Sequence, residues 1–150
     1  MSQIKNDKPA IVVLISPATE NREIEQLLYG LEEEAVPFEI HKGNNETAIN
    51  LSYQAAYTSR LGVGVGIGRD QLAVLHYEKL KKEAPIFQMN IQDKSLSLRA
   101  LGVNAARLVK GMPFKELEMN EQPIQHHSQV TKEKITEIVK RVLSELAKEG

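Results

Sequence analysis

Residues Leu61–Tyr77, LGVGVGIGRDQLAVLHY, are the stretch that decides the fold. Glycine alternates with valine and isoleucine from Gly62 to Gly68, and a period of two is the period of a β-strand. One face of this strand therefore carries branched apolar side chains, and the other carries only hydrogen. Because glycine packs nothing in a strand, the bare face predicts that another backbone approaches it closely.

The glycines do not have the spacing of a nucleotide-binding loop. The dinucleotide motif G-x-G-x-x-G needs glycine at its sixth position, which is Ile67 counted from Gly62 and Arg69 counted from Gly64. A phosphate loop also needs a lysine after the glycines, and none follows here. The next residues predict a second strand, so the stretch is interpreted as a central β-hairpin.

The composition of the 150-residue chain is that of one soluble globular domain, with 41% hydrophobic and 26% charged residues. A net charge of −1 provides no basic surface, so neither nucleic acid nor a membrane is expected as a partner. Cysteine is absent, which excludes disulfides and suits the cytoplasm. The apolar run Ile11–Ile15 is far too short to be a signal peptide or a membrane span.

Apolar runs alternate with amphipathic helical patterns along the chain. Thr19 or Asn21 is the expected cap of the first helix, and Asp93 that of a later helix that ends at Gly111. The order predicts an α/β fold: one three-layer-like domain with a mixed central sheet that contains one antiparallel hairpin, flanked by helices, plus a C-terminal helix. Besides the hairpin, strands are expected at 10–15, 38–41 and 85–89, and helices at about 21–35, 46–59 and 93–111.

The chain divides into four expected parts. They are a flexible N-terminus at 1–8, the α/β domain at 9–112, a linker at 113–130 and an amphipathic helix at 131–148. The linker is indicated by its prolines and its many polar residues. The apolar stripe of the last helix must be buried on its own domain or on a partner.

Three consecutive acids, Glu32, Glu33 and Glu34, end the first predicted helix, where the helix dipole disfavours negative charge. A local rule that is broken without an evident local gain can mark a functional position. At about 100° per residue, Glu33 lies almost opposite the apolar stripe of this helix and points towards solvent or a partner. A solvated helix end is the simpler interpretation, and the residues alone leave both open.

The histidines do not form a recognisable site. His126 and His127 would point opposite ways on an extended chain, and no third metal ligand is near them. His41 and His76 each end a predicted strand, as an exposed residue or as a pH switch. No Ser/His/Asp order, carboxylate pair or nucleophile elbow stands out, so no catalytic or cofactor-binding residue is expected in this chain.

Several short segments resemble one family when they are taken together and in order, over about residues 10 to 115. They are Tyr29-Gly30-Leu31-Glu32-Glu33, Val36-Pro37, Leu61 to Gly68, Ala73 to His76, Ala84-Pro85 and Leu101 to Gly111. This set resembles the small subunit of the diol/glycerol dehydratase reactivase. That family is similar in turn to the medium subunit of the coenzyme B12-dependent dehydratases.

The resemblance implies a non-catalytic subunit of a chaperone-like ATPase complex. The family implies a heterotetramer, whereas the sequence itself does not determine the stoichiometry. In that family the large subunit binds and hydrolyses ATP. The small subunit is thought to exchange with the dehydratase medium subunit, so that damaged cobalamin leaves the inactivated enzyme. The implied partners are therefore the large ATPase subunit and the dehydratase. The implied location is the cytoplasm, with a bacterial microcompartment left open.

The resemblance also implies a shared metal site. In that family the second glutamate of the G-L-E-E motif reaches the large subunit and helps to hold Mg²⁺ or another divalent ion near the ATP or ADP there. That position is Glu33 in this sequence. Glu33 is thus the expected metal ligand, and Gly30, Glu32 and Glu33 are the expected interface residues.

Two departures from the family keep other functions open. The family's small subunits end soon after the segment that matches Gly111, whereas a linker and a helix follow here. The alternative function is the medium subunit of a dehydratase, although those chains carry an N-terminal segment that is missing here. A free-standing α/β binding domain or enzyme is the third possibility. Neither diol nor glycerol dehydratase is favoured as the client.

Overall fold

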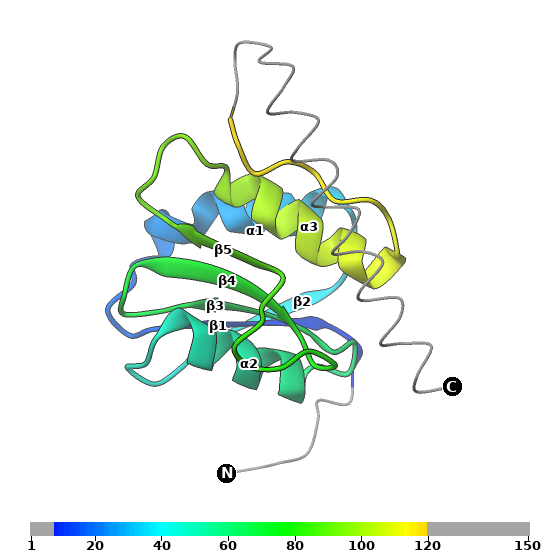
Figure 1. Ribbon diagram of the computed structural model, residues 1–150, viewed down its shortest axis with the longest axis horizontal. Helices are drawn as coiled ribbons and strands as arrows, with labels where there is room; N and C mark the ends of the chain where they lie inside the picture. The colour runs from blue at the N-terminus through cyan, green and yellow to red at the C-terminus, as the bar shows by residue number, and fades with distance from the viewer. Residues whose placement is uncertain (1–7, 120–150) are drawn as a thin grey trace.

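A five-stranded mixed sheet lies between two layers of helices in the computed structural model, which describes residues 8–119 (Figure 1). The predicted α/β fold with one antiparallel hairpin in a mixed sheet is confirmed, and the expected helix 131–148 lies outside the described residues. The strands are β1 (Ile11–Ile15), β2 (Phe38–Lys42), β3 (Val63–Ile67), β4 (Leu72–Tyr77) and β5 (Phe87–Asn90). The helices are the 3-10 helix η1 (Asn21–Ile24), α1 (Glu25–Glu33), α2 (Ala48–Thr58) and α3 (Leu98–Lys110).

The strand order β2-β1-β3-β4-β5 explains why the helices cover both faces. Strand β1 pairs in parallel with β2 on one side and with β3 on the other. The connection through α1 runs from β1 to β2, and the connection through α2 runs in the opposite direction, from β2 past β1 to β3. Because such crossovers are right-handed, their helices lie on opposite faces of the sheet. Helix α1 accordingly lies on one face with α3, and α2 lies on the other (Figure 1). Antiparallel pairing of β3 with β4 and of β4 with β5 completes the sheet.

The glycine face of β3 is covered by the backbone of α2. A Cβ atom added to Gly64 would overlap the backbone of Ala55 and Ala56, and one added to Gly66 would overlap the backbone nitrogen of Ser52. The predicted close approach of a second backbone is therefore confirmed, and that backbone is a helix. Missing side chains on the strand allow α2 to lie closer to the sheet than side chains would permit.

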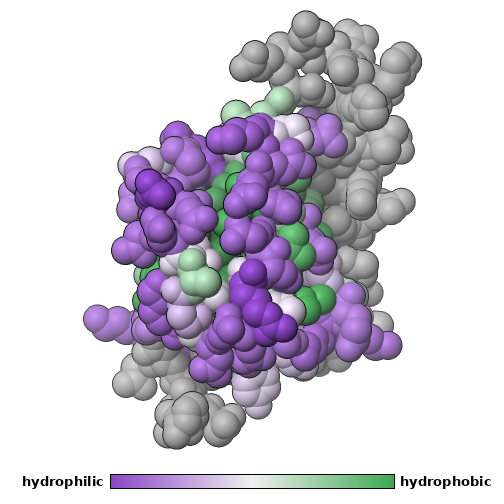
Figure 2. Space-filling model, turned by 90° about the vertical axis from the view of Figure 1, so that its left-hand side faces the viewer, coloured by the Kyte–Doolittle hydropathy of each residue, from purple (hydrophilic) through white to green (hydrophobic). Residues whose placement is uncertain are grey.

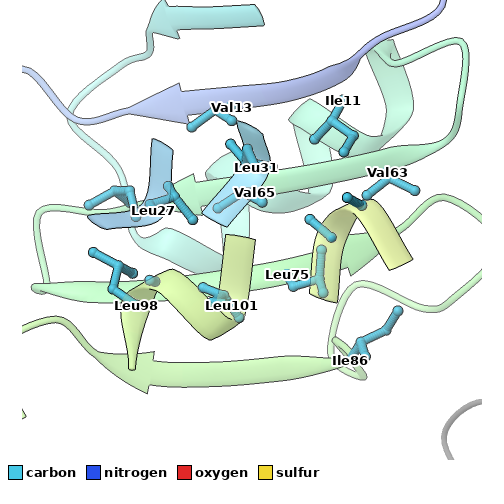
Figure 3. Packing of buried hydrophobic residues seen from close by; sticks show 14 of the residues in the cluster. Ile11, Val13, Leu27, Leu31, Val63, Val65, Leu75, Ile86, Leu98 and Leu101 are labelled. Atoms are coloured by element: carbon cyan, nitrogen blue, oxygen red, sulfur yellow. The ribbon is translucent and has the colours of Figure 1, made fainter. Parts of the chain in front are cut away.

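The main core fills the space between the sheet and the α1–α3 layer. In Figure 3, side chains of β1, β3 and β4 point towards leucines of α1 and α3. The stripe predicted for the first helix is buried at Ile24, Leu27 and Leu31, all at 1% exposure or less. Fully buried members of the core also include Ile11, Val13, Val63, Val65, Ile67, Leu75 and Leu101.

Two of the predicted helix caps are wrong. Glu20, not Thr19 or Asn21, precedes η1, and its backbone N–H donates to the Glu23 carboxylate at 2.7 Å. Asp93 does not cap α3, because its carboxylate closes a turn by accepting from the backbone and hydroxyl of Ser95 at 2.9 and 2.6 Å. Ser97 caps α3 instead and accepts from the Ala100 N–H at 3.0 Å. Asx turns compete with caps for the same acceptor, so composition alone does not separate them.

Packing continues past residue 112, where the sequence placed the start of a linker. The Asn104 side chain of α3 is fully buried and holds the backbone of Lys115 by two hydrogen bonds of 2.6 and 2.7 Å. Phe114 is buried edge-on against Phe87 of β5. We call residues 112–119 the strap, because they run back along α3 towards the residues before it, where Ser97 N donates to Leu117 O.

Candidate functional site

The three acids at the end of α1 lie beside α3, and the structure treats each of them differently. Helix α1 ends at Glu33, and Glu34 is its C-terminal cap residue. Glu32 and Glu33 are exposed, whereas Glu34 is partly buried. The nearby residues of α3 are cationic: Arg99 in its first turn, and Arg107 and Lys110 in its last turns. This junction, defined by Glu32, Glu33, Glu34 and those three cations, is called the α1–α3 charged edge.

Glu33 makes an ion pair with Arg99. The Arg99 Nε–H donates to Glu33 Oε2, while Glu33 Oε1 makes no hydrogen bond with the described residues. The Glu33 side chain is 35% exposed and that of Arg99 is 50% exposed, so the pair lies at the surface. The carboxylate points away from the core, as the helical geometry predicts, and one of its oxygens has no hydrogen-bond partner among the described residues.

Glu34 is held by two cations of α3. Lys110 Nζ donates to Glu34 Oε1 at 3.0 Å, and Arg107 Nε lies 3.5 Å from Glu34 Oε2. The hydrogen bond from Lys110, with the charges of Lys110 and Arg107, lowers the pKa of the Glu34 carboxyl below its ordinary value. Arg107 also donates to the Pro113 carbonyl at 3.3 Å, so Glu34 is linked through it to the strap.

These contacts provide the local gain that the sequence did not show. Glu33 and Glu34 offset the unfavourable helix-end position with cations of α3 that lie 66 and 76 residues further along the chain. The only signal in the sequence is that positions 99, 107 and 110 share one face of a helix. Glu32 differs from its neighbours, because it has neither an ion pair nor a hydrogen bond with the part of the chain that the structure describes.

The outward face of α1 joins Glu32 to an exposed tyrosine. Tyr29 is 42% exposed and lies one helical turn from both Glu25 and Glu32. Its hydroxyl donates to Glu25 Oε1 at 2.9 Å, and this hydrogen bond, with the Glu25 charge, raises the pKa of Tyr29 above its ordinary value. This face therefore presents an aromatic ring among carboxylates.

Gly30 lies on the other side of α1, at the crossing with α3. A Cβ on Gly30 would overlap the carbonyl of Arg99, so the glycine brings the two helices into backbone contact. Its neighbours in the described structure belong to its own chain. Its expected place at an interface with a second chain stays a prediction, and the direct effect of Gly30 is to set the position of Arg99.

The two strand-end histidines have different surroundings. His76 is fully buried; the Tyr77 N–H donates to its Nδ1 at 2.9 Å, and its Nε2 lies 3.0 Å from the Lys82 carbonyl. It is thus a structural residue that fastens the loop after β4, and an exposed strand end was the wrong expectation. His41 is exposed and lies 3.0 Å from Glu39 on the same edge strand. His126 and His127 lie outside the described residues.

The carboxyl ends of β1 and β3, where ligands commonly bind in α/β sheets, are closed by residues of the chain itself. The Asp70 carboxylate accepts from the backbone N–H of Ala48, the first residue of α2, at 3.2 Å. Arg69, in the turn between β3 and β4, donates to the carbonyl of Asn45, in the loop before α2, at 2.7 Å. The backbone N–H of Ala48, at the helix N-terminus that could hold an anion, is thus already engaged within the chain.

Neither a self-contained metal site nor a membrane span is found within residues 8–119. No group of three or more His, Asp or Glu side chains there could hold a metal ion. None of the helices in this range is both long enough and apolar enough to cross a bilayer. On the face shown in Figure 2, hydrophilic residues cover most of the described surface, and hydrophobic residues appear as small separate patches between them.

Comparison with known proteins places this domain in a family. Residues 8–115 match the family model described as dehydratase medium subunit. The diol dehydratase-reactivating factor small subunit of Klebsiella michiganensis is 38% identical over 109 residues, which are 73% of this chain and 86% of that protein. The propanediol dehydratase-reactivating factor small subunit of Citrobacter freundii is 43% identical over 90 residues, which are 60% of this chain and 77% of that protein.

Solved structures agree with the sequence relatives. A chain of the diol dehydratase-reactivating factor complexed with ADP and Mg²⁺ superposes with a TM-score of 0.68 at 34% identity, covering 73% of this chain and all of that one. A chain of glycerol dehydratase reactivase has a TM-score of 0.68 at 30% identity, covering 74% of this chain and all of that one. The chain therefore belongs to the dehydratase medium subunit family, among the small subunits of the diol/glycerol dehydratase-reactivating factors.

Proposed function

We propose that this chain is the non-catalytic small subunit of an ATP-dependent reactivating factor, which releases damaged cobalamin from inactivated diol or glycerol dehydratase by subunit exchange. One observation carries the proposal. The described domain matches a model named for the dehydratase medium subunit, while its curated relatives are subunits of reactivating factors. A domain with the outline of an enzyme subunit is suited to replace that subunit in a complex.

The proposal assigns ATP hydrolysis to a large partner subunit. A solved relative is a reactivating factor complexed with ADP and Mg²⁺, which supports a nucleotide in the assembly. In this chain the ends of β1 and β3 are closed by Asp70 and Arg69. The chain acts through its surface and its rigidity, in the cytoplasm or within a bacterial microcompartment.

Glu33 is the residue we assign to a divalent ion shared with the large subunit. A carboxylate is a preferred ligand of Mg²⁺, and Glu33 Oε1 has no hydrogen-bond partner among the described residues, on a side chain that is 35% exposed. This chain would supply one ligand, and the partner would supply the rest. The ion, when bound, would join the two subunits by taking oxygen ligands from both. Glu32 and Tyr29, which face outward beside Glu33, are assigned to the same interface, and Gly30 supports it from within.

The experiment that tests the function is purification of the full chain after co-expression with a candidate large ATPase subunit, and separately with the dehydratase. We expect a stable complex with the large subunit, and restored turnover when that complex and ATP are added to cobalamin-inactivated dehydratase. Failure to bind the large subunit, or binding without reactivation, would overturn the proposal.

The second candidate function is a structural medium subunit of the dehydratase, and the family description favours it. The same purification separates the two functions. A medium subunit would co-purify permanently with the other dehydratase subunits, and the holoenzyme would lack activity without it. The small subunit of a reactivating factor would leave dehydratase activity intact when omitted.

The role of Glu33 is tested by Glu33→Gln, which keeps the size of the side chain and removes its charge. Mg²⁺-dependent assembly with the large subunit should weaken, and reactivation should fall, while the domain stays folded. Glu83→Gln, at another exposed glutamate, is the matched control and should behave as wild type. Unchanged Mg²⁺ dependence in Glu33→Gln would remove Glu33 from the metal site.

A further inference from the structure

Arg99 holds Glu33 at one oxygen only. Its Nε–H donates to Oε2, and Oε1 is left without a hydrogen bond to the described residues. A carboxylate that is held in this way has one oxygen that accepts a hydrogen bond from Arg99 and a second oxygen whose position is restricted by that bond. A carboxylate that rotated freely would have to lose side-chain entropy when it bound an ion.

The backbone at Arg99 is fixed, which limits the positions from which its side chain can reach Glu33. Ser97 caps α3 two residues earlier, which fixes the first turn of the helix. The Arg99 carbonyl lies against Gly30, where α1 and α3 make backbone contact. Both ends of the Glu33–Arg99 pair are therefore attached to helices that cannot shift independently.

The other cations of the α1–α3 charged edge are already engaged. Lys110 and Arg107 pair with Glu34, so neither is available to orient Glu33. Glu32 has no ion pair with the described residues, and Arg99 is the cation that pairs with Glu33. This arrangement separates two tasks: Glu34 fastens α1 to α3, and Glu33 is oriented towards the surface.

We propose that Arg99 is a positioning residue, which orients Glu33 so that Oε1 is presented to the shared divalent ion. This inference rests on the proposed function, because it assumes that Glu33 is a ligand. Partners that orient a metal-binding side chain are commonly worth 10–100-fold in metal affinity. Since this pair is half-exposed and screened by water, we expect a smaller effect, about 3–10-fold.

The test is a MgCl₂ titration of assembly, with the full chain, the candidate large subunit and ADP at constant concentration. Arg99→Gln should raise the MgCl₂ concentration for half-maximal assembly by about 3–10-fold, with little change in the complex formed at saturating MgCl₂. Arg99→Lys should recover part of this shift. Lys110→Gln removes a cation from the same helix that pairs with Glu34 instead, so its midpoint should equal that of wild type.

The outcomes distinguish the positioning role of Arg99 from the metal-binding role of Glu33 on which it rests. If Glu33→Gln leaves the Mg²⁺ midpoint unchanged, the metal role of Glu33 fails and the positioning role fails with it. If Glu33→Gln alters Mg²⁺ dependence but Arg99→Gln matches Lys110→Gln, only the positioning role is overturned. A lower midpoint in Arg99→Gln would also overturn it, because Arg99 would then compete with the ion. In the double variant, Arg99→Gln should add no shift to that of Glu33→Gln.

Discussion

Gly30 of α1 and Gly102 of α3 lie at the same helix crossing, and each occupies the place where a side chain would overlap the other helix. A Cβ on Gly30 would meet the backbone of Arg99 and Val103, and one on Gly102 would meet that of Leu27 and Leu31. Paired glycines thus set the separation of the two helices. That separation places Arg99 beside Glu33 and the last turns of α3 beside Glu34.

Gly30→Ala should lower the free energy of unfolding by about 2–3 kcal/mol, because the added methyl group meets backbone that cannot move aside. The higher helix propensity of alanine, about 1 kcal/mol, offsets only part of the strain. Chemical denaturation measures the change. Gln26→Ala, at an exposed position of the same helix, should stay within about 0.5 kcal/mol of wild type. An equal effect of both variants would contradict close packing at the crossing.

Gly64→Ala should also destabilise the domain, by about 2–3 kcal/mol, since its Cβ would overlap the backbone of α2 at Ala55 and Ala56. Gly111→Ala is the comparison, because nothing lies within 4 Å of its Cβ and only its φ of +69° is unfavourable to alanine. That variant should lose about 1 kcal/mol. Thermal unfolding of the two variants should rank them in this order, and the reverse ranking would refute the contact between α2 and β3.

Ala35→Gly should raise the stability, although glycine usually lowers it. Ala35 has a φ of +58°, in the left-handed region that costs a residue with a Cβ about 1 kcal/mol. Relief of that strain exceeds the entropy cost of glycine, so a net gain of about 0.5 kcal/mol is expected. Ala84→Gly, at a position without a positive φ, should be neutral or destabilising. A loss of stability in Ala35→Gly would show that the strain is absent.

Glu34 should make the domain less stable in acid. Its pKa is lowered in the folded state by Lys110 and Arg107, so its ion pairs stabilise the fold above the ordinary value of 4.5. That contribution is lost as the pH falls through the lowered pKa, when the folded carboxylate takes up its proton. The stability difference between wild type and Glu34→Gln should therefore be present at pH 7 and shrink towards pH 3. Asp93 titrates in the same direction in both proteins and cancels in the difference.

Asn104→Ala should release the strap from α3, because both of its hydrogen bonds to the Lys115 backbone would be lost in a buried place. We expect a loss of about 1–3 kcal/mol and faster tryptic cleavage after Lys115. Asn104→Asp keeps the acceptor and loses the donor, so its stability and its cleavage rate should lie between those of wild type and Asn104→Ala. Asn44→Ala, at an exposed asparagine whose side chain makes no hydrogen bond with the described residues, is the control for both measurements. Unchanged cleavage after Lys115 would show that Asn104 does not hold the strap.

The sequence by itself determined the architecture of the described domain. Period-two alternation in 61–77 specified the hairpin, and the alternation of apolar runs with helical stripes specified the α/β layers. The glycine face also indicated close backbone contact, because a strand face without side chains can be covered only by a backbone that comes very close to it. The cap assignment failed at Asp93, because the same side chain can close a turn or begin a helix.

The tertiary structure alone decided what surrounds the acids at the end of α1. Sequence geometry placed Glu33 on the outward face, since 100° per residue suffices for that. It could not show that Arg99 would pair with Glu33, or that Lys110 would pair with Glu34, because those residues are distant in the chain. Only the folded crossing at Gly30 and Gly102 brings them together. Helical periodicity determines the side of a helix on which a side chain lies. An ion pair between two helices also depends on the distance between them, which only the packing of the folded domain sets.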